Sequence, residues 1–434
     1  MIFSGHLLLP TADASVTRAG ESVRLTPGWV RVEDGRLAEV REGALHARPD
    51  AGGEACVIAP GFIDAHLHLP QFDSIGASGM TLLEWLDRVI FPAEARWADA
   101  AYAANMGARV ARQLLAHGTT SIAAYATVHH EGTIAAIEAL AAAGVRGAVG
   151  QVLMERNAPP ELCRPRERLL AEAAALCERY PAFGKPGAKG IEHAVSPRFA
   201  VSCDDDLLRG AGTLALRAGA MVQTHLAEMV PECELVEGLF GGKTYTQVYD
   251  DAGLLTGRTI LGHGIYLSGH DRQTLARAGC VVAHCPAAND FLQSGAMNLG
   301  ALERSGVAVA LGSDIAGGFE RSMARVCRAM MHTQARRAWW GEPLPERART
   351  TNDGGHEEVP SAARAWWMAT AGNARACGWT DRGELREGLS ADVLVIEPDI
   401  AWQGAADPLS TILHAWDDRW LKHTLALGRV VYAA

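Results

Sequence analysis

The chain has 434 residues, of which 48% are hydrophobic and 21% are charged. This composition is typical of a globular protein and excludes a disordered chain, a collagen and a coiled coil. The formal net charge is −10, from 40 basic and 50 acidic residues, which argues against a protein that binds nucleic acid but does not exclude a free nucleobase as a ligand.

Cysteine usage and hydropathy predict a cytoplasmic protein. The chain has nine cysteines, and none of them forms a C-x-x-C pair, so we expect buried, reduced thiols. The first 15 residues lack the basic start and the long apolar stretch of a signal peptide. No stretch of 18 apolar residues is free of charge, so we expect no membrane partner.

The two ends of the chain are predicted to form strands. Short strand-like runs, separated by Gly, Pro and Asp, occupy residues 23–25, 29–32, 37–40, 392–397 and 424–432. A turn is expected at Gly428 and Arg429. We predict that residues 1–57 and 388–434 together build one small β-sandwich domain, rather than two unrelated tails.

Between these ends, strand-like runs alternate with helical patterns. Such alternation is typical of parallel strands joined by crossover helices. Eight units of about 41 residues over 58–387 favour a closed (β/α)8 TIM-like barrel over an open sheet. The expected strands are 58–68, 121–127, 147–154, 191–199, 221–228, 259–267, 281–287 and 307–315. The clearest expected helices are 99–117, 132–143, 167–180, 204–218 and 268–278.

Histidine or aspartate stands at the C-terminal end of four of the eight runs. His66 and His68 end the first run, and in a strand residues i and i+2 face the same side. His225, His263 and Asp314 lie at the ends of the fifth, sixth and eighth runs. In barrels of this type the chemistry takes place at that end. One such histidine would be an ordinary polar residue, but the shared position predicts a metal centre.

Imidazoles combined with a carboxylate suit Zn²⁺ and, as second choice, Fe²⁺. A second ion would need a bridging ligand, and the fourth run, IEHAVSPRF, has no lysine at its end. We therefore predict one metal ion per chain, with a position open for water. Glu228, three residues after His225, is a candidate general acid and base, although it could also be a surface glutamate that begins the next helix.

Longer motifs resemble the amidohydrolase superfamily and, within its one-metal deaminase branch, the guanine deaminases. The similarity covers nearly the whole predicted barrel, and the FPAE and SPRF segments are specific to that branch. The matching segments are PGFIDAHLHLPQF, LLEWLDRVIFPAEARW, SPRFAVSC, THLAE, YTQVYDDAGLLTGRTILGHGIYLS, AHCPAAND and LGSDIAGGFERSM.

The resemblance implies roles for the reactive residues. The residues that match the zinc ligands are His66, His68, His225 and Asp314. Glu228 matches the proton shuttle, and His263 matches a histidine that orients the water or the substrate. Asp314 would also accept a proton during the reaction.

The resemblance also implies a set of substrate contacts. Arg198 and Phe199 match the pair that binds the base, Gln71 matches a glutamine that contacts the purine, and Glu228 lies beside the ring. Trp85 would line the pocket, although a core tryptophan is an equal alternative. The alternatives without a binding role are a surface position for Arg198, a core position for Phe199 and a solvated amide for Gln71.

The implied activity is zinc-dependent hydrolysis of guanine to xanthine and ammonia by a homodimer. Three alternatives remain open: a deaminase of a related ring such as a pterin, a triazine or an oxidised guanine; a cyclic-amide hydrolase; and a binding protein that has kept the fold. Ala288 replaces a serine common in the family, which could change ring preference if that serine touches the substrate. Residues 336–359 match nothing, and a lid or a dimer contact is conceivable there.

Overall fold

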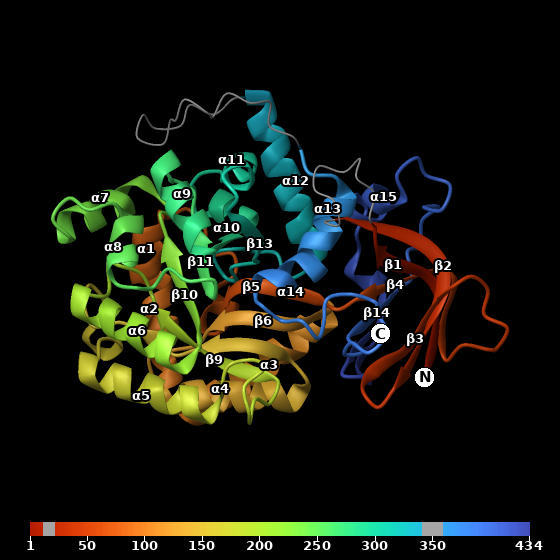
Figure 1. Cartoon of the computed structure of the whole chain (residues 1–434), viewed down its shortest axis with the longest axis horizontal. Helices are drawn as coiled ribbons and strands as arrows, with labels where there is room; N and C mark the ends of the chain where they lie inside the picture. The colour runs from red at the N-terminus through yellow and green to blue at the C-terminus, as the bar shows by residue number, and fades with distance from the viewer. Residues whose placement is uncertain (12–21, 341–358) are drawn as a thin grey trace.

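The protein is described by a computed structural model, which covers residues 1–11, 22–340 and 359–434. Within these residues, eight parallel strands follow one another around a barrel, and a separate sheet stands beside it with both chain termini (Figure 1). The barrel strands, in spatial order, are β5 (Phe62–His68), β6 (Thr119–Tyr125), β7 (Arg146–Gly150), β9 (Ile191–Pro197), β10 (Met221–Leu226), β11 (Thr259–His263), β12 (Val281–His284) and β13 (Ala308–Leu311). The predicted (β/α)8 barrel is confirmed.

The barrel closes where β5 meets the end of β13. The Asp314 amide donates to the His66 carbonyl at 2.8 Å, and the His68 amide donates to the Ile315 carbonyl at 3.0 Å. Beneath this seam, the Asn373 side chain donates to the Ile63 and Leu311 carbonyls at 2.6 and 2.8 Å. The closure therefore fixes Asp314 beside the two histidines of β5.

Helices cover the outside of the barrel. They include α3 (Ala100–Ala116), α4 (His130–Ala143), α5 (Arg166–Arg179), α6 (Asp205–Ala218), α7 (Val230–Leu239), α8 (Tyr245–Asp251), α9 (Gly269–Ala278), α11 (Leu299–Arg304), α12 (Met323–Trp340) and α13 (Ala362–Trp367). Shorter elements near the barrel mouth are η1 (Leu69–Ser74), α1 (Leu82–Trp85), η2 (Leu86–Ile90), α2 (Phe91–Ala95) and α10 (Pro286–Phe291). The remaining elements are β8 (Val152–Leu153), η3 (Arg96–Ala98), η4 (Pro160–Leu162), η6 (Met368–Gly372), α14 (Asn373–Ala376), α15 (Pro408–His414) and η7 (Asp418–Trp420).

The ends of the predicted helices follow capping chemistry. The Ser268 side chain caps α9 by accepting from the Asp271 amide, and the Asp204 side chain caps α6 by accepting from the Leu207 amide. Gly144 and Gly279 end α4 and α9 in the left-handed conformation, with φ of 98° and 72°. The expected boundaries of these helices are confirmed to within about two residues.

The two chain ends form one mixed sheet. Its strand order is β16 (Arg429–Ala433), β15 (Leu421–Ala426), β14 (Val393–Ile396), β4 (Ala51–Pro60), β1 (Ile2–Pro10), β2 (Val23–Glu33) and β3 (Arg36–Glu42). We expected a sandwich, and in the described residues these strands form a single hydrogen-bonded sheet with a small apolar core of its own. The joint domain of both ends is confirmed. Because β4 pairs with β1 and β14 up to Pro60, we propose Gly61 as the domain boundary in place of 57.

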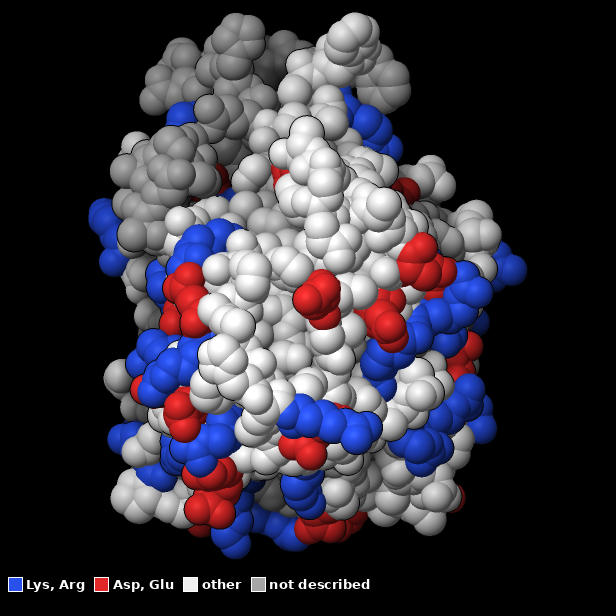
Figure 2. Space-filling model, turned by 90° about the vertical axis from the view of Figure 1, so that its right-hand side faces the viewer, with Lys and Arg blue, Asp and Glu red and all other residues white. Residues whose placement is uncertain are grey.

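The charge distribution, the hydropathy of the helices and the state of the cysteines agree with what the sequence predicts. On the face that Figure 2 shows, basic and acidic side chains are interspersed over the lower half of the view. Among the described residues, no helix combines the length and the apolar character that crossing a bilayer requires. All nine cysteines are free thiols, and most of them are buried, as expected.

Candidate active site

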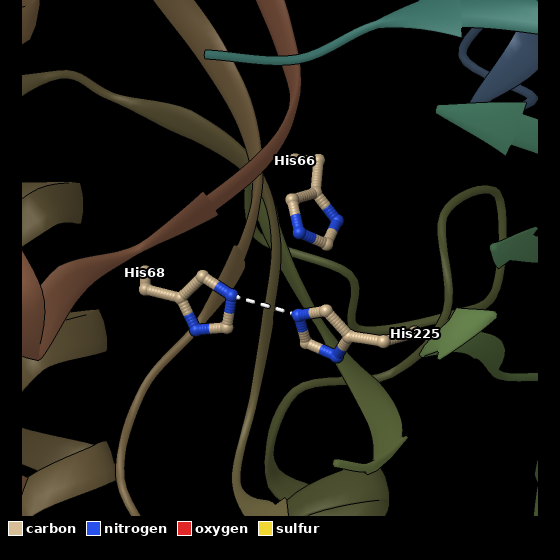
Figure 3. A group of neighbouring side chains, drawn as sticks. All are labelled: His66, His68 and His225. Atoms are coloured by element: carbon tan, nitrogen blue, oxygen red, sulfur yellow. Dashed lines mark hydrogen bonds between the residues drawn. The ribbon is translucent and has the colours of Figure 1, made fainter. Parts of the chain in front are cut away.

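Three imidazoles converge at the C-terminal mouth of the barrel (Figure 3). His66 and His68 extend from β5, and His225 extends from β10 across the barrel. The Nε2 atoms of His68 and His225 lie 3.0 Å apart, and the candidate ligand atoms of the three residues all lie within 4.8 Å of one another. The expected convergence of strands far apart in the sequence is therefore present.

A carboxylate and a fourth imidazole complete the cluster. Asp314 Oδ1 lies 3.4 Å from His66 Nε2 and 3.5 Å from His68 Nε2. His66, His263 and Asp314 form a second group whose ligand atoms lie within 4.8 Å of one another. The two groups share His66, so the cluster can hold one ion around that residue.

The cluster has the chemistry of a metal site. Burial lowers the pKa of His66, His68 and His225 well below the ordinary value of 6.5, so these imidazoles are neutral and have lone pairs free for a cation. His66 Nε2 is fully buried and has no hydrogen-bond partner in the described part of the chain. A divalent cation would satisfy that atom, so the residues fit the metal that the sequence implies.

Neighbouring groups orient the imidazoles. His225 Nδ1 lies 2.7 Å from the Arg198 carbonyl, and His263 Nδ1 lies 2.9 Å from Asn289 Oδ1. If each Nδ1 carries the proton, Nε2 of both rings is left as the acceptor that faces the cluster.

Two glycines make room for His66. A Cβ atom on Gly262 would lie 2.6 Å from His66 Cε1, and a Cβ atom on Gly312 would lie 2.6 Å from His66 Cβ. Gly262 directly precedes His263, and Gly312 lies two residues before Asp314. Their role is therefore to let the barrel close tightly around one imidazole.

We expect Gly262→Ala to weaken metal binding by at least about tenfold, because the added methyl group displaces the His66 ring. Competition with a chromogenic chelator measures the affinity. The matched control is Gly238→Ala on α7, where an added Cβ meets nothing within 4 Å. Equal metal affinity in the two variants would contradict the crowding argument.

Backbone strain is concentrated at the strand ends that form the site. Ala227, His263 and Asp314 have φ of 47°, 70° and 49°, in the left-handed region that residues other than glycine rarely adopt. They follow or end β10, β11 and β13. The surrounding hydrogen bonds hold these conformations and thereby direct His263 and Asp314 toward the cluster.

Glu228 is buried at the mouth and is not a surface residue. Its Oε2 atom lies 3.3 Å from His263 Nε2, and its Oε1 atom accepts from the Ser294 hydroxyl at 2.8 Å. Burial, together with the neighbouring Asp314 carboxylate, raises the pKa of Glu228 to about 8. A group that titrates near neutrality, next to a candidate metal site, is suited to proton transfer.

A pocket opens above the cluster and contains the expected substrate contacts. It is lined by His68, Gln71, Leu82, Trp85, Leu86, Arg198, Phe199, His225, Glu228, Glu232, His263, Leu292 and Asp314. All five residues expected to contact the substrate line this one cavity: Gln71, Trp85, Arg198, Phe199 and Glu228. A surface arginine, a core phenylalanine or a solvated amide would not be expected to share a cavity. Trp85 is both buried and part of the wall. Ala288 is fully buried in the apolar core and does not line this pocket, so a direct contact with the substrate ring is not supported.

Sequence reasoning missed three residues that support the pocket. Glu94 pairs with Arg198, Ser294 donates to Glu228, and Glu232 accepts from the Glu228 amide at 2.9 Å. Glu94 lies inside the FPAE segment, so the motif was a usable signal for it. Of residues 336–359, 341–358 lie outside the described residues, and the lid and dimer hypotheses for that segment stay predictions.

The buried acids predict a pH-dependent stability of the metal-free protein. Burial raises the pKa of Asp64 and Glu232 to about 7 and that of Glu228 to about 8. Between about pH 4.5 and 7 these folded groups hold protons that the unfolded chain has released, so their contribution to stability falls as the pH rises from about 4.5 to about 8 and then levels off. The neutral histidines act in the opposite direction, but only below about pH 6.5, where unfolded histidine is charged.

The measurement is thermal unfolding with a chelator and with added metal. We expect the melting temperature of the metal-free protein to fall between about pH 6.5 and 8, and the stabilisation by metal to grow over the same range, because a cation offsets the ionised carboxylates. A metal-free melting temperature that rises over this range would contradict the burial of neutral acids.

Comparison with known proteins identifies the family. The model of the Amidohydrolase family matches residues 57–431. The chain belongs to the amidohydrolase family. It is 35% identical to a probable guanine deaminase from Deinococcus radiodurans over 90% of this chain and 84% of that protein. It is 31% identical to the guanine deaminase of Escherichia coli over 87% of this chain and 83% of that protein.

Solved structures agree with the sequence comparison. The E. coli guanine deaminase superposes on this amidohydrolase with a TM-score of 0.86 and 28% identity, over 100% of this chain and 99% of that one. Guanine deaminase from C. acetobutylicum, solved with guanine in the active site, has a TM-score of 0.86 and 27% identity over 99% of each chain. Amidohydrolases are metal-dependent, and the cluster around His66 is the group in this chain that could hold the ion.

Proposed function

We propose that this amidohydrolase hydrolyses guanine to xanthine and ammonia. The observation that carries the proposal is the likeness, over 99% of both chains, to the C. acetobutylicum enzyme with guanine in its active site. The pocket supports it, because planar and polar groups converge there beside a candidate metal centre.

The substrate would lie between aromatic and polar walls. Phe199 and Trp85 offer apolar surface to a flat ring, and Arg198 offers N–H donors to a ring carbonyl and an adjacent nitrogen. Gln71 faces the same cavity. These groups bind and orient the base so that the carbon bearing the amine faces the histidine cluster.

The residues proposed to hold the ion are His66, His68, His225 and Asp314. A divalent cation held there would lower the pKa of a water from ~16 toward ~7 and so supply a nucleophile at neutral pH. We propose Zn²⁺ because nitrogen and carboxylate ligands suit it, with Fe²⁺ as the second choice.

Glu228 would transfer the protons of the reaction. It takes a proton from the nucleophile and gives it to the ring nitrogen beside the reacting carbon, which makes that carbon a better electrophile. Asp314 accepts the second proton, and protonation of the leaving amine releases ammonia. His263, held by Asn289, would keep Nε2 directed at Glu228 and accept a hydrogen bond from the carboxyl group while that group is protonated.

Ammonia release from a panel of rings tests the substrate. We expect guanine to exceed pterin, adenine, cytosine and an aminated triazine by at least about 100-fold in kcat/KM, with about one zinc per chain in the same sample. A pterin or a triazine as the best substrate would overturn the proposal. Release of no ammonia from any ring by metal-loaded protein would favour a binding role.

We also propose a cytoplasmic homodimer. Trp339 on α12 is 82% exposed, an unusual environment for tryptophan and one that a partner subunit would cover. Trp366 and Trp367, in contrast, are buried in the core of one chain. Light scattering at the concentration of the assay tests the dimer.

A further inference from the structure

We propose that Glu94, which lies behind the pocket, sets the hydrogen-bonding pattern that the pocket presents to the substrate ring. It does so by fixing Arg198 and the amide orientation of Gln71. This inference rests on the proposed function and adds a positioning residue that determines specificity.

Glu94 is held at the back of the two polar contacts. It lies on α2 and is 1% exposed. Arg198 Nη1 lies 2.7 Å from both carboxylate oxygens of Glu94, and Gln71 Nε2 donates to Glu94 Oε1 at 3.1 Å. Phe91 of the same helix stacks on the guanidinium, with Arg198 Cζ 5.6 Å from the ring centroid. One helix therefore holds Arg198 by charge and by an aromatic face.

The carboxylate decides which end of the Gln71 amide faces the substrate. A carboxylate paired with an arginine only accepts hydrogen bonds, so Gln71 must turn its NH₂ group toward Glu94. The Gln71 carbonyl oxygen is then left as an acceptor for the substrate. Arg198 uses Nη1 for Glu94, so its remaining N–H groups are left as donors.

The resulting edge is a donor beside an acceptor. A ring with a carbonyl next to an N–H, as in guanine, complements it. A ring with an amino group in place of that carbonyl opposes the Arg198 donors with another donor and leaves both unpaired. Glu94 thus gives the pocket its preference for an oxo ring without touching the substrate.

Glu94→Gln tests this role, because a glutamine has nearly the same shape but can also donate. Gln71 is then free to turn either way, and Arg198 loses one of its two bonds. The substrates are guanine and 2,6-diaminopurine, which carry the same reacting 2-amino group. We expect KM for guanine to rise at least about tenfold, kcat to change less than about threefold, and the preference for guanine to shrink at least about tenfold. Metal content stays at the parent value.

Glu192→Gln is the matched control. Glu192 is 2% exposed and pairs with Arg258 at the N-terminal end of β9, away from the pocket. The Glu192 carboxylate is buried like that of Glu94 and is also held by an arginine, although Arg258 is 31% exposed. A generic loss from replacing a buried, paired glutamate would therefore affect both variants, whereas KM and selectivity should change only in Glu94→Gln. Calorimetry with xanthine gives the same comparison without turnover, and we expect at least about tenfold weaker binding in Glu94→Gln.

If the Glu94→Gln variant does not fold, a neutron crystal structure of the deuterated parent protein with xanthine decides the question, because it distinguishes the N–D groups of the Gln71 amide from its oxygen. We expect Gln71 Nε2 on Glu94 and Gln71 Oε1 on a ring N–H, whereas Nε2 directed at the ring would overturn the inference. A parent protein without guanine turnover overturns the proposed function. A parent with turnover, combined with a folded Glu94→Gln variant of unchanged KM and selectivity, overturns only the role of Glu94.

Discussion

Replacing Glu228 with glutamine is expected to lower kcat for guanine by a factor of about 10² to 10⁴ while the metal is retained. Glutamine has the same size and can keep the contact with the Ser294 hydroxyl, but it cannot accept and release a proton. Because Glu228 is not among the proposed ligands, the metal site stays intact. Steady-state ammonia release and elemental analysis on one sample provide the two measurements.

The control for this variant is Glu234→Gln on α7, which removes an exposed carboxylate six residues along the chain. We expect it to turn over guanine at the parent rate. Near-parental turnover in Glu228→Gln would remove the proton-transfer role, and loss of metal from that variant would show that Glu228 supports the cluster instead.

Replacing His66 with alanine is expected to abolish both metal binding and turnover. His66 belongs to both groups of candidate ligands, and its buried Nε2 atom has no hydrogen-bond partner among the described residues. Removing a direct ligand should weaken metal binding by more than the ~10–100-fold that loss of an outer partner costs. Metal content after gel filtration and ammonia release test both parts.

His193→Ala separates the loss of a ligand from the loss of a buried imidazole. His193 is also fully buried on a barrel strand, but its Nδ1 atom contacts the Val149 carbonyl and it belongs to neither ligand group. We expect the His193 variant to be less stable and yet to bind metal. Parental metal content in His66→Ala would exclude the proposed ligand set.

The barrel could be predicted from sequence because its signals are local and repeat. Each predicted run overlaps an observed barrel strand, and Ser268, Asp204 and the closing glycines set helix ends through nearby backbone groups. The strands of the sheet formed by the two chain ends were less predictable from sequence. Residues 23–25 and 29–32, expected as separate runs, form one strand, β2, because pairing with β1 continues through Pro27 and Gly28.

The metal cluster could be predicted because parallel strands place their C-terminal ends at one mouth, so that His66 and His225 meet although 159 positions separate them. The supporting residues could not, because their importance depends on which side chains they touch. Glu94 is distant in sequence from Arg198, and no spacing rule joins the two. Gly262 likewise matters only because the His66 ring packs against it.

The most direct test is the metal content of the purified protein, measured together with guanine turnover before and after chelation. We expect about one divalent ion per chain, loss of turnover when the ion is removed, and recovery when zinc is returned. Full turnover of guanine by protein that holds no metal would contradict the central claim, that buried histidines and an aspartate at the barrel mouth bind one catalytic cation.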